Sequence, residues 1–441
     1  MNLKNCIALL LFCCFSTSAQ EGFRYNSTKN KISIPFQFIN NLIFIPININ
    51  GLELNFLLDT GVEETVLFGL EDAEISSFKN AEKINLKGFG REDFVEGLKS
   101  ENNVLACGDF IDKNHEIYIV LDQNFNFSSQ VGIAVNGIIG YKFFKNYLIE
   151  TNYSSRKIVI RQETLKFRKK LNTKYSESEI IIDGNKPYFK TKISTDNKEI
   201  GTKMLIDSGS GDAVWLFENQ KNKIKVPDSN IDDYLGRGFS GELFGKRSRI
   251  GKLAFGNFEF KNALTSFPDS LAITCSRLVQ DREGSIGGEI LKRFDVVYDY
   301  PNQKIYFKKN GNFNMPFNFN MSGIEIEHDG LQWVAESNQY RTAKANTISF
   351  SENDVKLNDV KFSFSLKPVF KIANIRKNSA AEIAGLKKGD IIVEINGSKA
   401  INFNLQEINE LLKSEEGKRI SMKINRNDRD IEYSFVLKSI L

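Results

Sequence analysis

Apolar and polar residues alternate with a period of two over much of this chain, which is the pattern of β-strands that bury one face. Three such stretches follow one another at KISIPFQFI (31–39), LIFIPININ (42–50) and LELNFLLD (52–59), separated by Asn-Asn and Asn-Gly turn sequences. The plan recurs at YFKTKIS (188–194) and GTKMLID (201–207). Segments with helical spacing are brief until the C-terminal part, so the alternation predicts a mostly β protein.

The strand pattern is present twice, at a nearly constant spacing. Asp59 in FLLDTGVEETVLF (56–68) lies 148 residues before Asp207 in MLIDSGSGDAVWLF (204–217). The same spacing relates LACGDF to LAFGNF, and a spacing one residue shorter relates NYSSRKIVI to DYPNQKIYF. Such a register indicates two copies of one fold. We therefore expect lobes over residues 30–162 and 178–308, joined by the polar stretch 163–180.

Each copy delivers one carboxylate, Asp59 or Asp207, directly after an apolar run. If the lobes face each other across a pseudo-twofold axis, the two acids become neighbours. Adjacent carboxylates cannot both ionise cheaply, so they hold one proton between them. Such a pair can deprotonate a water while it protonates a carbonyl oxygen, which hydrolyses an amide without a metal. The residues that follow each acid are Thr60 and Gly61 in the first copy and Ser208 and Gly209 in the second. The hydroxyls can form hydrogen bonds across the lobe interface, and the glycines leave room for backbone to approach the carboxylates.

These motifs resemble those of aspartic peptidases of the pepsin and retropepsin type. The resemblance covers roughly residues 30–310 and includes a short element ending in Ile-Gly downstream of each acid, at 138–140 and 285–287. It implies a bilobal fold of closed β-barrel lobes in tandem, a water between the acids, and cleavage of extended peptides. The hairpins at 88–98 and 236–245 resemble the family's flap. That likeness implies substrate contacts from Gly88, Phe89, Gly90, Gly236 and Gly238.

The sequence departs from the family pattern at several positions. Ser285 stands where the family has an apolar residue, and Val62 where it has a small Ala or Ser. Because a hydroxyl is missing at Val62, we expect a pH optimum nearer neutral than that of pepsin. Phe89 is the nearest aromatic to the flap tyrosine of pepsins. The lobes are short for a pepsin and closer to fused retropepsin-like halves. These departures leave open whether the dyad is active.

The C-terminal segment has a different pattern. An Asn-rich stretch at 308–320 predicts a linker. NSAAEIAGLKKGDIIVEINGSKA (378–400) predicts a short helix, a glycine turn and a strand, and NLQEINELLK (404–413) predicts an amphipathic helix with Asn404 as its N-cap. Together with a closing hairpin at 419–437, this series resembles a PDZ domain of bacterial type, which we place at 318–441.

The PDZ resemblance implies that an extended peptide C-terminus adds as a strand beside the 404–413 helix. MSGIEIEHDGL (321–331) resembles the carboxylate-binding loop and the first ligand-pairing strand, which implies contacts from Ser322, Gly323, Ile324, Glu325 and Ile326. The alternative is a structural domain packed on the lobes with its groove filled. Residues 332–365 are expected to form an insertion before the strand VFKIANI (369–375).

The N-terminus has the features of a bacterial signal peptide. Lys4 is followed by an apolar run at 6–15 and by small residues before Gln20. We expect residues 1–19 to be removed and the mature protein to be periplasmic or secreted. The run is too short to span a membrane. Phe12 is bulky where a lipid anchor on Cys13 or Cys14 requires a small residue, which disfavours such an anchor.

Composition limits the other partners. The 59 basic and 55 acidic residues are well mixed and give a formal net charge of +4, so nucleic acid is not expected. The chain has 2 histidines, and its mature part keeps only Cys107 and Cys275, so we expect no metal, no other cofactor and no Ser-His-Asp triad. Whether the two cysteines pair stays open. We expect a monomer that binds peptide or protein substrates.

Two further functions compete with the peptidase. A catalytically inert scaffold with a degenerate dyad would bind peptides through its PDZ domain and cleave none. A glycosidase would need its carboxyls about 5 Å or more apart around a sugar. The duplicated loops instead predict acids in hydrogen-bonding contact, which disfavours the glycosidase.

Overall fold

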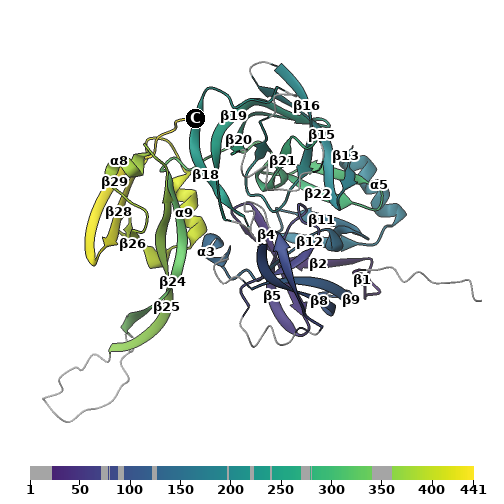
Figure 1. Ribbon diagram of the computed structural model, residues 1–441, viewed down its shortest axis with the longest axis horizontal. Helices are drawn as coiled ribbons and strands as arrows, with labels where there is room; N and C mark the ends of the chain where they lie inside the picture. The colour runs from purple at the N-terminus through teal and green to yellow at the C-terminus, as the bar shows by residue number, and fades with distance from the viewer. Residues whose placement is uncertain are drawn as a thin grey trace, which may run out of the picture.

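The computed structural model of the chain is mostly β and comprises two lobes and a C-terminal unit (Figure 1). The residues that the structure describes are 22–70, 78, 80–87, 94–121, 127–195, 198–218, 223–238, 241–269, 279, 281–339 and 360–441. The predicted signal peptide, the flap residues Gly88, Phe89 and Gly90, and Cys275 lie outside this part. Cys107 is a buried free thiol.

The N-terminal lobe is a closed barrel. Its strands pair in the order β9, β6, β10, β5, β4 and β8, and β8 pairs again with β9, so the sheet has no open edge within this ring. The elements of this lobe are β1 (Arg24–Tyr25), β2 (Lys31–Pro35), β3 (Gln37–Ile39), β4 (Leu42–Ile49), β5 (Leu52–Leu58), β6 (Thr65–Leu67), β7 (Glu82–Lys87), β8 (Phe94–Cys107), β9 (Phe110–Val120), α3 (Phe127–Val131), β10 (Gly137–Ile139), α4 (Tyr141–Phe144), β11 (Leu148–Asn152) and β12 (Lys157–Arg161). Because β1 pairs with β9, the lobe begins ahead of residue 30.

The second lobe repeats this barrel. Strands β15, β16, β21, β17, β20 and β19 pair in that order, and β19 returns to β15. The elements are α5 (Leu165–Lys174), β13 (Ser176–Glu179), β14 (Ile181–Asp183), β15 (Lys186–Thr195), β16 (Lys198–Ile206), β17 (Val214–Leu216), β18 (Asn230–Gly238), β19 (Gly241–Phe255), β20 (Phe258–Pro268), β21 (Gly284–Ile286), α7 (Gly288–Leu291), β22 (Phe294–Asp299) and β23 (Lys304–Lys309).

Strand register confirms the duplication. In the first lobe β10 runs parallel to β5 with Gly137 opposite Phe56, and in the second β21 runs parallel to β16 with Gly284 opposite Met204. These pairs are separated by the same spacings as the sequence repeat. The apolar runs before the acids are the buried strands β5 and β16, since Leu58 and Ile206 are fully or almost fully buried.

A further sheet joins the lobes, in the order β13, β23, β22, β11, β12 and β2. Its central seam pairs β11 with β22, placing Ile149 opposite Tyr298, both buried. The stretch 163–180, predicted as a polar linker, contributes α5 and β13 to this region. The connection between the lobes is itself folded, because Phe167 and Leu171 of α5 lie one helical turn apart and bury against the sheet.

The C-terminal unit is a sheet in the order β24, β25, β26, β28 and β29, flanked by two helices. Its elements are β24 (Ile324–Gln339), β25 (Val360–Ile375), α8 (Ala380–Ala384), β26 (Ile391–Ile395), β27 (Ser398–Lys399), η1 (Ala400–Asn402), α9 (Leu405–Leu412), β28 (Arg419–Arg426) and β29 (Arg429–Val436). Asn404 caps α9 in a capping box with Glu407, which confirms the predicted N-cap.

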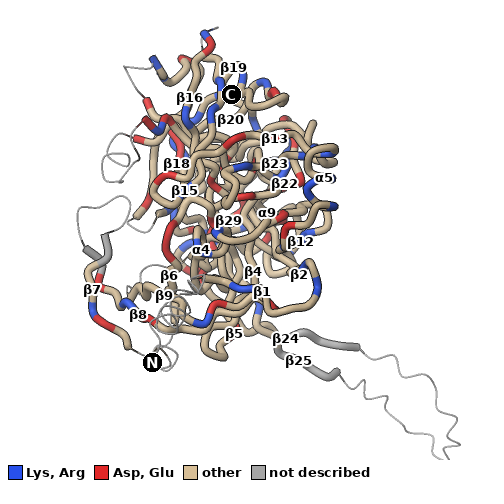
Figure 2. The backbone as a smooth tube through the Cα atoms, turned by 90° about the vertical axis from the view of Figure 1, so that its right-hand side faces the viewer, with Lys and Arg blue, Asp and Glu red and all other residues tan. Residues whose placement is uncertain are grey.

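The stretch 308–320, predicted as a linker, includes the end of β23 and then irregular backbone. It packs on the protein, because Phe317 and Phe319 are buried and the Arg293 guanidinium donates to backbone oxygens at Phe313 and Met315. Within the expected insertion at 332–365, residues 332–339 and 360–365 are the outer parts of β24 and β25, which form one long hairpin. This hairpin projects away from the lobes (Figures 1 and 2). Over the described residues, basic and acidic side chains are interspersed along the backbone (Figure 2).

Candidate active site

Each acid follows the same kind of strand and begins the same kind of loop. The backbone N–H of Asp59 donates to the carbonyl of Ile139, and that of Asp207 donates to Ile286, both at 2.9 Å. β5 and β16 therefore end against the two Ile-Gly elements, β10 and β21. The acids lie where the two lobes meet, because the residues next to them form hydrogen bonds from one lobe to the other.

The hydroxyls next to the acids cross between the lobes. Thr60 Oγ1 donates to the carbonyl of Ile206 at 2.6 Å and accepts from the backbone N–H of Ser208 at 3.0 Å. Reciprocally, Ser208 Oγ donates to the carbonyl of Leu58 at 2.8 Å and accepts from the Thr60 N–H at 3.0 Å. Both side chains are almost fully buried. Four hydrogen bonds thus fix the two acid loops against each other.

The two carboxyls face one small space. A Cβ on Gly61 would lie 3.0 Å from an Asp207 carboxyl oxygen and 3.1 Å from one of Asp59. A Cβ on Gly209 would lie 2.1 Å from an Asp59 oxygen, which no side chain can occupy. The Gly61 N–H donates to Asp59 Oδ1 at 2.7 Å and the Gly209 N–H to Asp207 Oδ1 at 3.2 Å. Glycine at both positions therefore lets the acids approach.

Burial and mutual repulsion change the protonation of the pair. Burial, followed by the negative charge of Asp207, raises the pKa of Asp59 to about 7, although the Gly61 amide opposes the rise. Burial also raises the pKa of Asp207, with the charge of Arg282 opposing it most strongly. Since the pKa of Asp59 lies close to neutrality, the pair retains one proton up to about pH 7.

Two cations near the dyad were missed by sequence reasoning. Arg282 lines the same cavity as Asp207, and Lys186 lowers the pKa of both acids. By strand register, the first lobe has Leu42 where the second has Lys186, and Val135 where it has Arg282. The two copies therefore differ in charge beside otherwise equivalent acids. The repeat spacing of 147 aligns Arg282 with Val135, whereas Lys186 corresponds to Leu42 only through the strand register.

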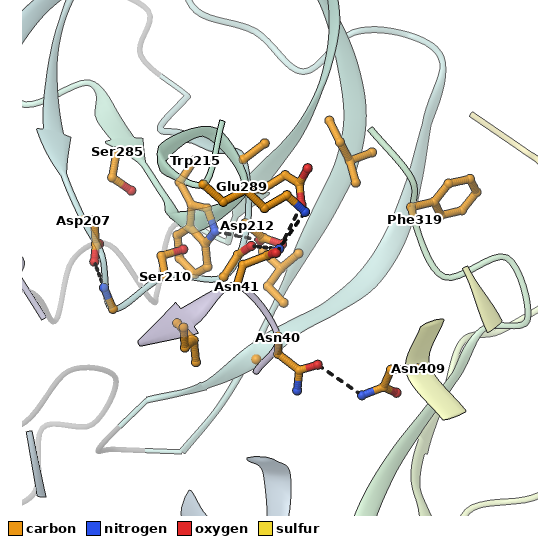
Figure 3. A pocket seen from close by; sticks show the side chains of 18 of the residues that line it. Asn40, Asn41, Asp207, Ser210, Asp212, Trp215, Ser285, Glu289, Phe319 and Asn409 are labelled. Carbon is orange, nitrogen blue, oxygen red and sulfur yellow. Dashed lines mark hydrogen bonds and ion pairs between the residues drawn. The ribbon is translucent and has the colours of Figure 1, made fainter. Parts of the chain in front are cut away.

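The acids line a cavity of about 1220 Å³ that extends towards the C-terminal unit. Its walls include the predicted Gly236 and Gly238 of β18, and Ser285, which is drawn above Asp207 in Figure 3. Gly236 has φ of 135°, and the β18–β19 register shifts next to it, so glycine is required at this bulge. The hairpin β18–β19 therefore forms one side of the cavity over the second acid loop.

The C-terminal unit completes the other end of this cavity. Glu325 of β24, Asn409 of α9 and Lys413, which directly follows α9, are part of its wall. The Asn409 side chain donates to Asn40 Oδ1 at 3.4 Å, which joins α9 to the first lobe (Figure 3). A Cβ on Gly132, directly after α3, would lie 2.9 Å from Leu405 Cβ, so α3 lies beside α9 (Figure 1).

The predicted carboxylate-binding loop has internal hydrogen-bond partners. Asn320 Oδ1 accepts from the backbone N–H groups of Ser322 at 3.1 Å and Gly323 at 3.3 Å. The Ile324 N–H donates to Ser322 Oγ at 3.1 Å. Ile324 and Ile326 are buried in the core of the unit, whereas Glu325 faces the cavity. An amide oxygen therefore occupies the position from which these donors would bind a peptide carboxylate.

A buried row of polar side chains lies away from the cavity. Thr65 Oγ1 is 2.6 Å from His115 Nε2, and His115 Nδ1 is 2.7 Å from Asp112 Oδ2. Although the order is that of a hydrolase triad, Thr65 is 0 % exposed, so no substrate can reach it. Among the described residues, no group of three or more His, Cys, Asp or Glu side chains is placed to hold a metal ion. No helix among them is long and apolar enough to cross a membrane.

A comparison with protein families identifies one region of the chain. A family model described as PDZ domain matches residues 371–426. The match begins within β25 and includes α8, β26, α9 and all of β28, the elements that the sequence pattern predicted for this domain. The C-terminal unit of this mostly β protein therefore contains a PDZ domain, a module that binds peptides or proteins.

Proposed function

We propose that this chain is an exported aspartic endopeptidase in which Asp59 and Asp207 activate a water that hydrolyses peptide bonds. The observation that carries the proposal is the pair of reciprocal hydrogen bonds by which the Thr60 and Ser208 hydroxyls reach the opposite lobe. These bonds hold the two equivalent acid loops together, with both carboxyl groups close to Gly61. The tandem barrels with duplicated Asp-Thr/Ser-Gly loops support a likeness to pepsin and retropepsin lobes. The mature form would begin near Gln20 and act as a monomer in the periplasm or outside the cell.

The charges around the dyad suggest a role for each acid. Asp59 lies on the apolar side and keeps the proton, whereas Arg282 and Lys186 favour the ionised form of Asp207. Asp207 would take a proton from the water as its oxygen bonds to the scissile carbonyl carbon, and Asp59 would give its proton to the carbonyl oxygen. When the C–N bond breaks, the leaving amine nitrogen takes the proton from Asp207, and one hydroxyl of the tetrahedral carbon returns a proton to Asp59, which restores the starting dyad.

The shape of the cavity supports a peptide as substrate. It is large enough for an extended segment, and the hairpin β18–β19 can cover the substrate and exclude water. β24 is the edge strand of its sheet, so a peptide C-terminus could add to it as a further strand beside α9. For that to happen, the Asn320 side chain must first leave the loop amides.

The proposal is tested by incubating the mature protein with a peptide library from acidic to neutral pH. We expect cleavage that is lost in Asp59→Asn and in Asp207→Asn and is blocked by a statine-type inhibitor. Asp228→Asn is the matched control, since it removes an exposed acid outside the cavity and should leave activity unchanged. Absence of cleavage at every pH, or cleavage that survives both dyad substitutions, would contradict the peptidase.

The second candidate function is an inert peptide-binding scaffold. The observation that favours it is the PDZ domain itself, which can bind peptides whether or not the dyad reacts. In that case library peptides would bind to wild-type protein and to Asp207→Asn with equal affinity, and none would be cut.

A further inference from the structure

A buried cation of the C-terminal unit contacts the hairpin β18–β19, which forms one side of the cavity at the dyad. Arg376 follows β25 and is 9 % exposed. Its Nη1 donates to Asp233 Oδ1 of β18 at 3.3 Å, and both terminal nitrogens donate to the carbonyl of Asn320 at 3.3 Å. The Arg376 backbone N–H also donates to the carbonyl of Gly323 at 2.7 Å, which fixes the residue to the PDZ loop.

The contact continues as a line of alternating charges to the second acid loop. Asp233 Oδ2 accepts from Arg247 Nε at 2.8 Å, and Arg247 Nη1 donates to Asp212 Oδ1 at 3.0 Å. Asp212 belongs to the loop that begins with Asp207, and its other oxygen accepts from Trp215 Nε1 at 2.8 Å (Figure 3). The line therefore connects the PDZ loop, the hairpin and the loop of the second acid.

The members of this line are shielded from solvent. The side chains of Arg376, Asp233 and Arg247 are 5 %, 10 % and 11 % exposed. A second ion pair between the same two parts, Lys388 with Glu242, spans 3.7 Å and its side chains are 63 % and 44 % exposed. Since water and salt screen exposed pairs far more than buried ones, the Arg376 contact should dominate.

We propose that Arg376 is a positioning residue through which the PDZ domain holds the hairpin β18–β19 over the dyad. Arg376 itself lies outside the cavity wall, whereas Asp233 and the following residues of β18 line it. The PDZ domain thus sets how tightly the cleft encloses a peptide. The consequence for catalysis rests on the proposed function, whereas the mechanical coupling does not.

Hydrogen exchange measured on the full mature chain tests the coupling. In Arg376→Gln we expect the amides of β18 and of the paired half of β19 to exchange about tenfold faster, because a buried charged hydrogen bond is lost. Arg376→Lys should restore slow exchange, and the control Lys388→Gln should match wild type. Unchanged exchange in Arg376→Gln would overturn the proposal. So would equally faster exchange in β4 and β5, which reports general destabilisation.

Kinetics give a second readout that a purely structural role would not produce. With a cleaved library peptide, Arg376→Gln should raise KM about tenfold while kcat stays within about twofold, since the dyad loops are held by Thr60 and Ser208. Arg376→Lys should recover most of the KM. Equal losses in kcat and kcat/KM, with KM unchanged, would contradict the positioning role. If the mature chain cleaves no peptide, the proposed function fails, and the exchange experiment alone decides the coupling.

Discussion

The two lobes agree in the backbone that holds the acids and differ in the charges around them. Both acids donate an N–H to an Ile-Gly element, and both flanking hydroxyls reach the carbonyl before the opposite acid. The lobes differ at the strand positions around the acids, where the first lobe has Leu42 and Val135 and the second has Lys186 and Arg282.

This difference in charge shows how two equivalent acids can take different roles, one holding the proton and the other ionised. Identical surroundings would leave the shared proton equally distributed between the acids. Burial raises the pKa of both, but the cations oppose that rise most directly at Asp207. The duplicated backbone therefore places the two acids together, and the different charges in the two lobes explain why Asp59 rather than Asp207 keeps the proton.

The largest expected effect concerns stability at neutral pH. The pKa of folded Asp59, about 7, lies above the ordinary value of 3.8, so the folded state favours the protonated acid. This contribution is fully present below pH 3.8 and is lost as pH rises through 7. Asp59→Asn stays neutral, so above pH 7 its free energy of unfolding should exceed that of wild type by on the order of 4 kcal/mol.

Denaturant unfolding of wild type and Asp59→Asn across the pH range measures this difference. The two curves should converge at acidic pH and separate towards neutral pH. Parallel curves would mean that Asp59 ionises at its ordinary pKa.

The second prediction compares the two glycines. Gly209→Ala would put a Cβ 2.1 Å from an Asp59 oxygen, whereas Gly61→Ala would put one 3.0 Å from Asp207. Displacement of a catalytic group by about 1 Å can cost about 100-fold in rate. We therefore expect Gly209→Ala to reduce kcat/KM by at least about 100-fold, and Gly61→Ala to cause a smaller loss. Equal retention of activity would show that the acids do not need this close approach.

The third prediction concerns removal of the Thr60 hydroxyl, which forms hydrogen bonds to the other lobe. Thr60→Val removes the acceptor of the Ser208 N–H and the donor to the Ile206 carbonyl. Each buried group left unpaired costs about 1–3 kcal/mol, measured as the free energy of unfolding in denaturant. Thr60→Ser keeps the hydroxyl and should lose much less. Similar losses in both variants would point to the missing methyl group rather than to the hydrogen bonds.

The smallest expected effect tests how the charge difference between the lobes changes the pKa of Asp207. Arg282→Met removes the cation that opposes the raised pKa of Asp207. That pKa should rise further, so the acidic limb of the kcat/KM profile should move to higher pH by about one unit. Arg282→Lys keeps the charge and should leave the limb in place. A shift to lower pH, or an equal shift in both variants, would contradict the role given to this charge.

The sequence predicted the repeated strands and the acid loops because the same local pattern occurs twice. The cations were not predicted, since Lys186 and Arg282 reach the dyad only through pairing between segments distant in the chain. The same holds for Asn320, whose amide oxygen fills a loop that a PDZ pattern leaves open. The helix α5 was missed because its polar residues outnumber the two that bury, Phe167 and Leu171.

Carboxyl titration tests the central claim, one proton shared by two acids, most directly. The mature protein is labelled with ¹³C at the aspartate carboxyls and followed by NMR from acidic to neutral pH. We predict one carboxyl that titrates near pH 7 and is absent from the spectrum of Asp59→Asn. Titration of every aspartate below about pH 5, in both proteins, would contradict a shared proton and the hydrolytic role derived from it.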